Sequence, residues 1–301
     1  TEPPEPDREA EQRAPEDAPD WLFRVIANQP AFTAPAQTPP IAGAPPVRVF
    51  MATPHTPPVN IMPEALVAVR INEDGSRQRV ISGLFNPAQN EMRWHGFEGA
   101  YYIIESNMVD FVDVSPGEWF HGAVTFAAAR ELFEGMGGGR FEPYTHMTRA
   151  MFITVLSRLD GIDAEFYHGA ATFADVGDGD NAWYNAAISW GQFRGIITPG
   201  ILAGGAPNHF RPHDNITREE MAVMIANYLS YRDLPLGATL VPQFYDITNA
   251  APWAQIPIAT MRSHGIIAGR GDNTFDPAST ATRAEVSQIF RNLVHAITGL
   301  N

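Results

Sequence analysis

One set of residues recurs three times in the same order between positions 111 and 283, and it constrains the fold more than any other feature. Each copy opens with Phe-x-Asp-Val or Phe-x-Asp-Ile, continues through a tryptophan, and reaches a Phe-x-Pro element. An arginine in a Thr-Arg pair stands eight residues beyond each Phe-x-Pro phenylalanine. Order and spacing that recur this closely are typical of tandem structural repeats.

The spacing within the copies is nearly constant. The tryptophan and the phenylalanine of Phe-x-Pro are 22 residues apart in the first and third copies and 27 in the second, which has an insertion. A glycine precedes Phe-x-Pro in two copies, as Gly135 and Gly269, whereas the second copy has Pro199 at the matching position.

Each copy predicts a helix–turn–helix unit, with the tryptophan at the start of the first helix and the threonine at the start of the second. Thr217 with Glu220, and Thr282 with Glu285, fit a capping box, in which the threonine and glutamate side chains each bond a backbone N–H of the other residue. The first copy has Met151 in place of the glutamate. We therefore expect its reciprocal cap to be lost.

The recurring arginines and tryptophans each allow two interpretations. A cation in the first turn of a helix is mildly unfavourable, by roughly 0.3–1 kcal/mol, because the helix start carries partial positive charge. The arginine therefore either binds an anion together with backbone N–H groups or pairs with an aspartate of a neighbouring repeat. The tryptophans favour burial in the core, and the alternative is an apolar platform for a sugar ring.

The repeated motif resembles the S-layer homology domain over residues 109–298. The resemblance implies three mostly helical repeats arranged as a pseudo-threefold prism. It also implies that anionic, pyruvylated secondary cell-wall polysaccharide binds in grooves between adjacent repeats, which anchors the chain at the extracellular cell surface. The polysaccharide-binding residues that it implies are Asp113, Trp119, Gly135, Arg149, Asp175, Trp183, Arg218, Asp246, Trp253, Gly269 and Arg283.

The residues before the repeats differ in character. Residues 1–58 hold 14 of the 26 prolines, and eight of the first 20 residues are acidic, which predicts an extended arm. Its apolar segment 21–26 either docks on a neighbouring surface or donates a strand to another subunit. Residues 64–86 predict a β-hairpin around an Asp-Gly turn.

These patterns together predict a mainly α fold in 109–298, preceded by a small β unit and a Pro-rich arm. The expected divisions are the arm at 1–58, the β unit at 59–108, and repeats at 109–165, 166–235 and 236–298.

Composition excludes several classes of function. The net charge is −14 and every basic residue is arginine, which argues against nucleic-acid binding and excludes lysine-dependent catalysis. Cysteine is absent, so thiolate metal sites are excluded, and no apolar run is long enough to cross a membrane. We expect no metal, no cofactor and no enzymatic activity.

The sequence therefore predicts a non-catalytic cell-surface protein anchored to the bacterial wall, with wall polysaccharide as its partner. The alternative is a self-assembling subunit of an S-layer, sheath or filament, in which copies of the chain contact each other through the arm. A third interpretation is an anchor fragment of a larger enzyme.

Overall fold

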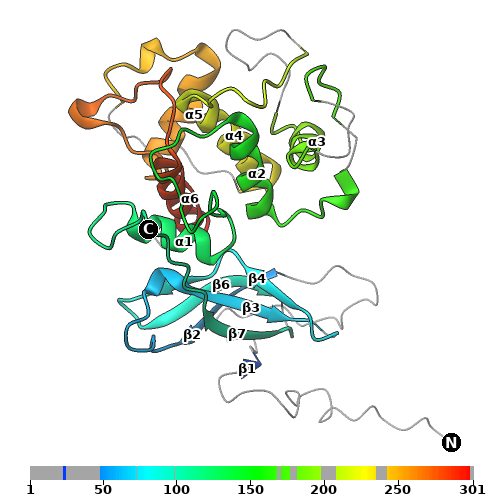
Figure 1. Ribbon diagram of the computed structural model, residues 1–301, viewed down its shortest axis with the longest axis vertical. Helices are drawn as coiled ribbons and strands as arrows, with labels where there is room; N and C mark the ends of the chain where they lie inside the picture. Colours follow the sequence, from blue (N-terminus) through cyan, green and yellow to red (C-terminus); the bar gives the residue numbers. More distant parts are fainter. Residues whose placement is uncertain are drawn as a thin grey trace, which may run out of the picture. The chain divides into compact units, whose positions relative to one another are not determined.

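The computed structural model divides the chain into two compact units, one ending at Met108 and the other beginning at Val109. Within the residues that the structure describes, the first unit contains β-strands in two antiparallel sheets and the second contains six α-helices (Figure 1). The described residues are 23–24, 48–72, 74–97, 99–167, 171–176, 182–197, 208–234 and 243–298.

The prediction of a mainly α fold is wrong, because sheets and helices both contribute substantially. Helix is limited even inside the repeats, where short helices of 9 to 16 residues alternate with long irregular turns. Those turns are held by hydrogen bonds between side chains and backbone rather than by helix. The residue bounds of the arm, the β unit and the single repeats stay predictions.

The N-terminal unit is built from two antiparallel sheets. Their strand orders are β1-β7-β3-β4 and β2-β6-β5. The strands are β1 (Phe23–Arg24), β2 (Arg48–Pro54), β3 (Leu66–Ile71), β4 (Arg77–Val80), β5 (Leu84–Asn86), β6 (Glu91–Phe97) and β7 (Tyr101–Ser106), and a 3-10 turn η2 (Pro63–Ala65) precedes β3.

The predicted hairpin is confirmed in its central part, because β3 and β4 pair antiparallel with Ile71 opposite Arg77. Gly75, at a φ of 80°, donates its N–H to the Asn72 carbonyl and so closes the turn. The end of the predicted hairpin behaves differently: β5 leaves β4 and pairs with β6 in the other sheet.

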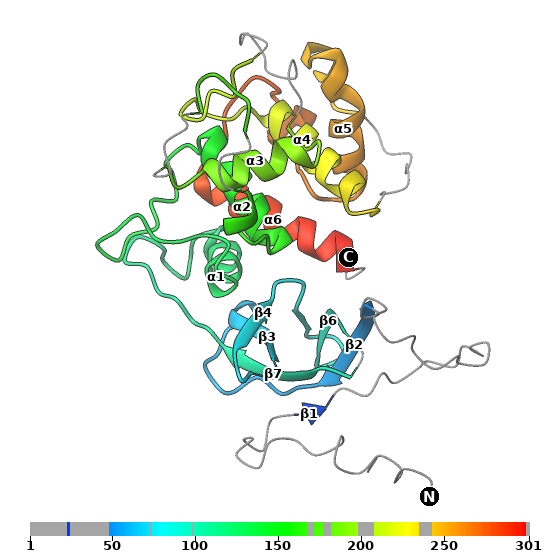
Figure 2. The same ribbon diagram turned by 90° about the vertical axis from the view of Figure 1, so that its right-hand side faces the viewer.

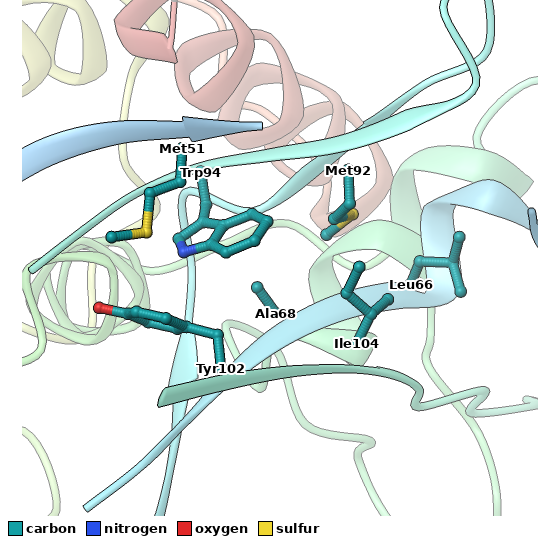
Figure 3. Packing of buried hydrophobic residues seen from close by; sticks show 7 residues of the cluster. All are labelled: Met51, Leu66, Ala68, Met92, Trp94, Tyr102 and Ile104. Atoms are coloured by element: carbon teal, nitrogen blue, oxygen red, sulfur yellow. The ribbon is translucent and has the colours of Figure 1, made fainter. Parts of the chain in front are cut away.

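Side chains between the two sheets form one apolar core (Figure 3). Strand β6 alternates half-buried and buried residues, which is the period-2 pattern of a strand with one face inside. Trp94 lies between the two methionines of its own sheet, opposite Tyr102 of the other. The members of this apolar core are Met51, Leu66, Ala68, Met92, Trp94, Tyr102 and Ile104.

The C-terminal unit has two helices for each copy of the motif. They are α1 (His121–Ala129) and α2 (Arg149–Asp160), α3 (Asn185–Phe193) and α4 (Arg218–Tyr231), and α5 (Pro252–Ser263) and α6 (Arg283–Thr298). None of the described helices is long and apolar enough to span a membrane. Short 3-10 turns stand between them at η3 (Glu165–Tyr167), η4 (Ile247–Asn249) and η5 (Gly271–Asn273).

The predicted starts of the second helices are confirmed by their caps. Thr217 and Glu220 form the complete capping box. The Glu285 carboxylate accepts the Thr282 N–H, while Thr282 Oγ1 accepts the Glu285 N–H, so α6 has the same reciprocal pair. Helix α2 has only the threonine half of the cap, as Met151 predicts. The first helices begin less regularly, since α1 and α3 start two residues after their tryptophans whereas α5 starts one residue before.

The three repeats contact one another in a closed series. The second helix of each repeat packs on the first helix of the next, as the pairs α2–α3, α4–α5 and α6–α1, and both views show these pairs side by side (Figures 1 and 2). The segments before α2, α4 and α6 also meet, through the backbone bridges His146–Thr282, Thr148–Asn215 and Thr217–Thr280. Repeat 3 therefore returns to repeat 1, and each repeat is held on both sides.

A charge buried between repeats 1 and 2 gives a test of this closure. Arg149 is fully buried, and its Nη1 lies 2.6 Å from Oε1 of the equally buried Glu220. Changing Arg149→Met leaves that carboxylate without its nearest cation, and we expect a loss of roughly 3 kcal/mol of unfolding free energy. Urea titration of the whole chain measures this loss. Glu134→Gln, which removes an exposed pair with Arg158, is the matched control and is expected to cost less than about 1 kcal/mol.

Candidate functional site

The three opening aspartates hold the Phe-x-Pro turns of their own repeats. Asp113 accepts the N–H groups of Phe141 and Glu142, at 2.8 and 2.9 Å. Asp175 and Asp246 accept the two equivalent N–H groups in their repeats. The second residue of each turn has a φ near +60°, which is a strained conformation for a non-glycine residue, so the carboxylate stabilises an otherwise unfavourable turn.

Asp113 stays ionised to unusually low pH. Its partial burial, the largest single effect, raises the pKa, but the two backbone N–H bonds and the nearby Arg140 together bring the pKa below its ordinary value. Arg140 Nε lies 3.8 Å from Asp113 Oδ2, and its side chain is well exposed. The aspartate is therefore a fixed negative charge with an accessible arginine beside it.

The three recurring arginines lie inside the contacts between repeats. Each donates from Nε to the carbonyl oxygen of the Phe-x-Pro phenylalanine in the next repeat, and its guanidinium also lies over that phenylalanine ring. These bonds are Arg149 to Phe210 at 2.7 Å, Arg218 to Phe275 at 2.8 Å and Arg283 to Phe141 at 2.8 Å.

The arginine of one repeat is thus brought next to the aspartate turn of the following repeat. We call these places junctions: junction 1/2 is built from Arg149 and Asp175, junction 2/3 from Arg218, Asp246 and Gly269, and junction 3/1 from Arg283, Asp113 and Gly135.

Burial decides how these arginines act. Their exposed fractions are 0% for Arg149 and 4% for both Arg218 and Arg283. Desolvation lowers the pKa of all three, and that of Arg283 to about 10, so the Arg283 guanidinium is still charged at neutral pH. The structure shows that each of these arginines pairs with the neighbouring repeat. The bonded partner in all three is a phenylalanine carbonyl oxygen rather than an aspartate. Contact of these arginines with a ligand stays a prediction.

The turn glycines are required by close packing rather than by an unusual φ. A Cβ on Gly269 would lie 2.5 Å from the Phe244 ring and 2.6 Å from the Thr274 carbonyl oxygen. A Cβ on Gly135 would lie 3.0 Å from the Phe111 ring. Arg218 Nη2 and Arg283 Nη2 bond the carbonyl just before these glycines, which ties the glycine turn to the arginine across each junction. Pro199, the matching residue of the second copy, lies outside the described residues.

The tryptophans do not lie in the core. Trp119 and Trp183 are 61% and 60% exposed, so the expectation of burial is wrong for both, whereas Trp253 is only partly exposed. Trp119 and Trp183 lie on irregular segments just before α1 and α3. In each case the residue that is buried is the one after the tryptophan, Phe120 or Tyr184. The exposed indole face leaves an apolar surface at these two repeats.

A second aromatic residue at two of the repeats was missed by the sequence analysis. Phe120 contacts both Trp119 and Tyr144 edge-on. In repeat 2, Tyr184 makes the same contacts with Trp183 and His213. Tyr144 and His213 both follow the proline of Phe-x-Pro. That shared position is the sequence pattern from which this aromatic group could have been predicted. Repeat 3 has Ala254 and Ala278 at the matching places, so it lacks this aromatic group.

Comparison with known proteins identifies the repeats. The family model described as the S-layer homology domain matches three segments, residues 110–151, 172–222 and 243–287. The chain therefore carries three tandem S-layer homology domains, and each matched segment runs from an opening motif to the start of the second helix. Such domains, together with relatives named as surface-layer and cell-surface proteins, point to an extracellular location associated with the cell wall.

The relatives are much longer than the chain. It is 35% identical over 196 residues to Exoglucanase XynX of Acetivibrio thermocellus, covering 64% of the chain and 17% of that protein. It is 31% identical over 245 residues to Amylopullulanase of Thermoanaerobacterium thermosulfurigenes, covering 76% of the chain and 12% of that protein. A third, Cellulosome-anchoring protein of A. thermocellus, is 33% identical over 54% of the chain and 35% of its own length. The chain thus spans less than a fifth of the first two relatives.

The packing around the turn glycine gives a matched pair of variants. Gly269→Ala forces the Phe244 ring or the turn to shift, and we expect it to lower the unfolding free energy by roughly 1–3 kcal/mol. Gly271→Ala, two residues away, meets no atom within 4 Å and is expected to change it by less than about 0.5 kcal/mol. Thermal or urea unfolding of both variants measures the difference. Equal stability of the two would show that the glycine turn is not packed as described.

Proposed function

We propose that the chain is a non-catalytic cell-surface anchor whose three domains bind an anionic, pyruvylated wall polysaccharide at the junctions. The observation that carries this proposal is the exposure of Trp119 and Trp183 beside junctions that concentrate arginine. A sugar ring needs an apolar face to pack on, and its acidic substituent needs a cation.

Each junction offers a second arginine that is closer to solvent than the buried one. Arg140, Arg211 and Arg270 have side-chain exposed fractions of 60%, 25% and 42%. We assign direct contact with carboxylate groups to these side chains, because a guanidinium can bond both oxygens of a carboxylate. The buried arginines add positive charge beneath them, and the opening aspartates fix the turns around which the contacts form.

A second candidate function is a self-assembling structural subunit, and one observation favours it. Strand β1 of the N-terminal arm pairs with the edge of β7, with Phe23 opposite Tyr102 and Arg24 opposite Tyr101. A strand added to a sheet edge from an arm can equally be supplied by another copy of the chain. Electron microscopy of the concentrated protein tests this candidate, which ordered arrays would support and uniform single particles would oppose.

The anchoring proposal is tested by co-sedimentation with purified wall, with and without its pyruvyl groups. We expect the chain to sediment with intact wall and to lose binding when the pyruvyl groups are removed. The double variant Trp119→Ala with Trp183→Ala is expected to bind on the order of tenfold more weakly, because exposed aromatic residues often dominate a contact surface. Phe166→Ala, which removes another exposed aromatic residue, is the control and should bind normally. Equal binding to walls without pyruvyl groups would contradict the proposal.

A further inference from the structure

Two phenylalanine side chains of repeat 2 lie on the surface close to each other. Phe166 of η3 and Phe193, the last residue of α3, are 74% and 68% exposed. Single exposed apolar residues are ordinary on a protein surface, whereas a contiguous group of them marks an interaction site. The contacts between these two side chains and their neighbours decide which case applies.

The buried Tyr167 ring joins the two phenylalanines into one surface. Its centroid lies 5.0 Å from that of Phe166 and 6.2 Å from that of Phe193. Arg194 donates from Nε and Nη2 to the Tyr167 hydroxyl oxygen, at 3.2 and 3.0 Å, and its guanidinium lies over the rings of Phe193 and Tyr231. We call Phe166, Tyr167, Phe193, Arg194 and Tyr231 together the repeat-2 patch.

The repeat-2 patch lies at the opposite end of the helices from the recurring arginines. Arg218 begins the 14-residue helix α4, and Tyr231 ends it. At 1.5 Å per residue, these two residues are roughly 20 Å apart. Phe193 likewise ends its helix. The patch is therefore a surface separate from the junctions.

The residues that build the patch are particular to repeat 2. Ten residues beyond its tryptophan, repeat 2 has Phe193, where repeats 1 and 3 have Ala129 and Ser263. Thirteen residues beyond the recurring arginine it has Tyr231, where the other two repeats have aliphatic residues. The fold that the three repeats share therefore does not require these rings.

The two ends of the patch carry opposite charges. Glu165 directly precedes Phe166 and is exposed, and Arg194 is exposed beside Phe193. Neither of these two charged side chains forms an ion pair with any residue that the structure describes. A carboxylate and a guanidinium that do not pair within one chain are available to pair across an interface.

We propose that the repeat-2 patch binds the same patch of a second copy of the chain about a twofold axis. Such a contact is isologous, so if one residue touches another across the axis, the reverse contact forms as well. The phenylalanines of the two copies then pack together, and Glu165 of each copy meets Arg194 of the other. Aromatic rings flanked by opposite charges are self-complementary under this symmetry.

The contact formed in this way is small, because it involves few side chains. Interfaces that bury little surface are weak and transient. The dimer is therefore expected at the high local concentration of a crowded cell surface and not in dilute solution. This inference goes beyond the anchoring function and does not depend on polysaccharide binding.

Charge reversal tests the proposed arrangement. Sedimentation velocity of the whole chain, from low to high micromolar concentration and without polysaccharide, measures the monomer–dimer equilibrium. We expect Glu165→Arg and Arg194→Glu each to weaken the dimer on the order of tenfold, because each places like charges across the interface. An equimolar mixture of the two variants is expected to dimerise as the parent chain does, since the facing charges are opposite again.

Two pairs of variants control for other effects. Phe193→Ala removes an exposed ring of the patch and is expected to weaken the dimer, whereas Trp119→Ala removes an exposed ring elsewhere and should leave it unchanged. Asp110→Arg changes the net charge as much as Glu165→Arg does, at an exposed position outside the patch, and should also dimerise normally. The melting temperature of each variant shows that it is folded.

Three results would overturn the inference. They are a parent chain that stays monomeric throughout the concentration range, a dimer that Phe193→Ala does not weaken, and a mixture of the charge-reversed variants that dimerises no better than either alone. Failure of wall binding would contradict the anchoring proposal and leave this inference standing, because no polysaccharide enters the measurement. Phe166→Ala remains a valid control for wall binding in dilute solution, where the chain is monomeric.

Discussion

The bond from an arginine Nε to a phenylalanine carbonyl in the next repeat is the interaction on which the C-terminal unit depends. It occurs three times at 2.7–2.8 Å and joins residues as far apart as Arg283 and Phe141. A buried guanidinium is expensive to desolvate, and here a carbonyl and an aromatic face compensate part of that cost. Because the third bond returns to the first repeat, the series closes, and each aspartate turn and glycine turn is held against an arginine.

Closure also explains why three similar repeats need not perform the same task. Their local structure is set by shared residues, but the charge at each junction depends on two different repeats. Glu220 pairs with Arg149 of the preceding repeat, whereas repeat 1 has Met151 at the position of Glu220. The aromatic residues vary in the same way, since repeat 3 has alanines where repeats 1 and 2 have large rings. A tandem array can therefore keep one fold while the charges and the aromatic residues at its junctions differ.

Local features were predictable from the sequence because they depend on neighbouring residues. The threonine caps, the missing reciprocal cap at Met151 and the hairpin around Gly75 follow from short-range rules, and the structure confirms them. The repeat count was also predictable, because the spacing of the motif is a property of the sequence. The family match confirms that count.

Long-range features were harder to predict. No pattern in the sequence says that the partner of Arg218 is the carbonyl of Phe275, 57 residues away, because every residue has such a carbonyl. Trp119 is exposed because α1 begins two residues after it. A difference of two residues is smaller than the accuracy with which a helix start can be predicted from sequence. The prediction of a mainly α fold was wrong because it counted helices from the motif. It ignored both the irregular turns within each repeat and the contribution of the sheets.

A crystal structure of the chain with a pyruvylated fragment of wall polysaccharide tests the central claim most directly. That claim is that the arginine-closed junctions are the places where the polymer binds. The account predicts that the fragment's carboxylate lies within hydrogen-bond distance of an arginine at a junction, with a sugar ring packed against Trp119 or Trp183. A fragment bound only to the N-terminal sheets, or to helix surfaces away from all three junctions, would contradict it.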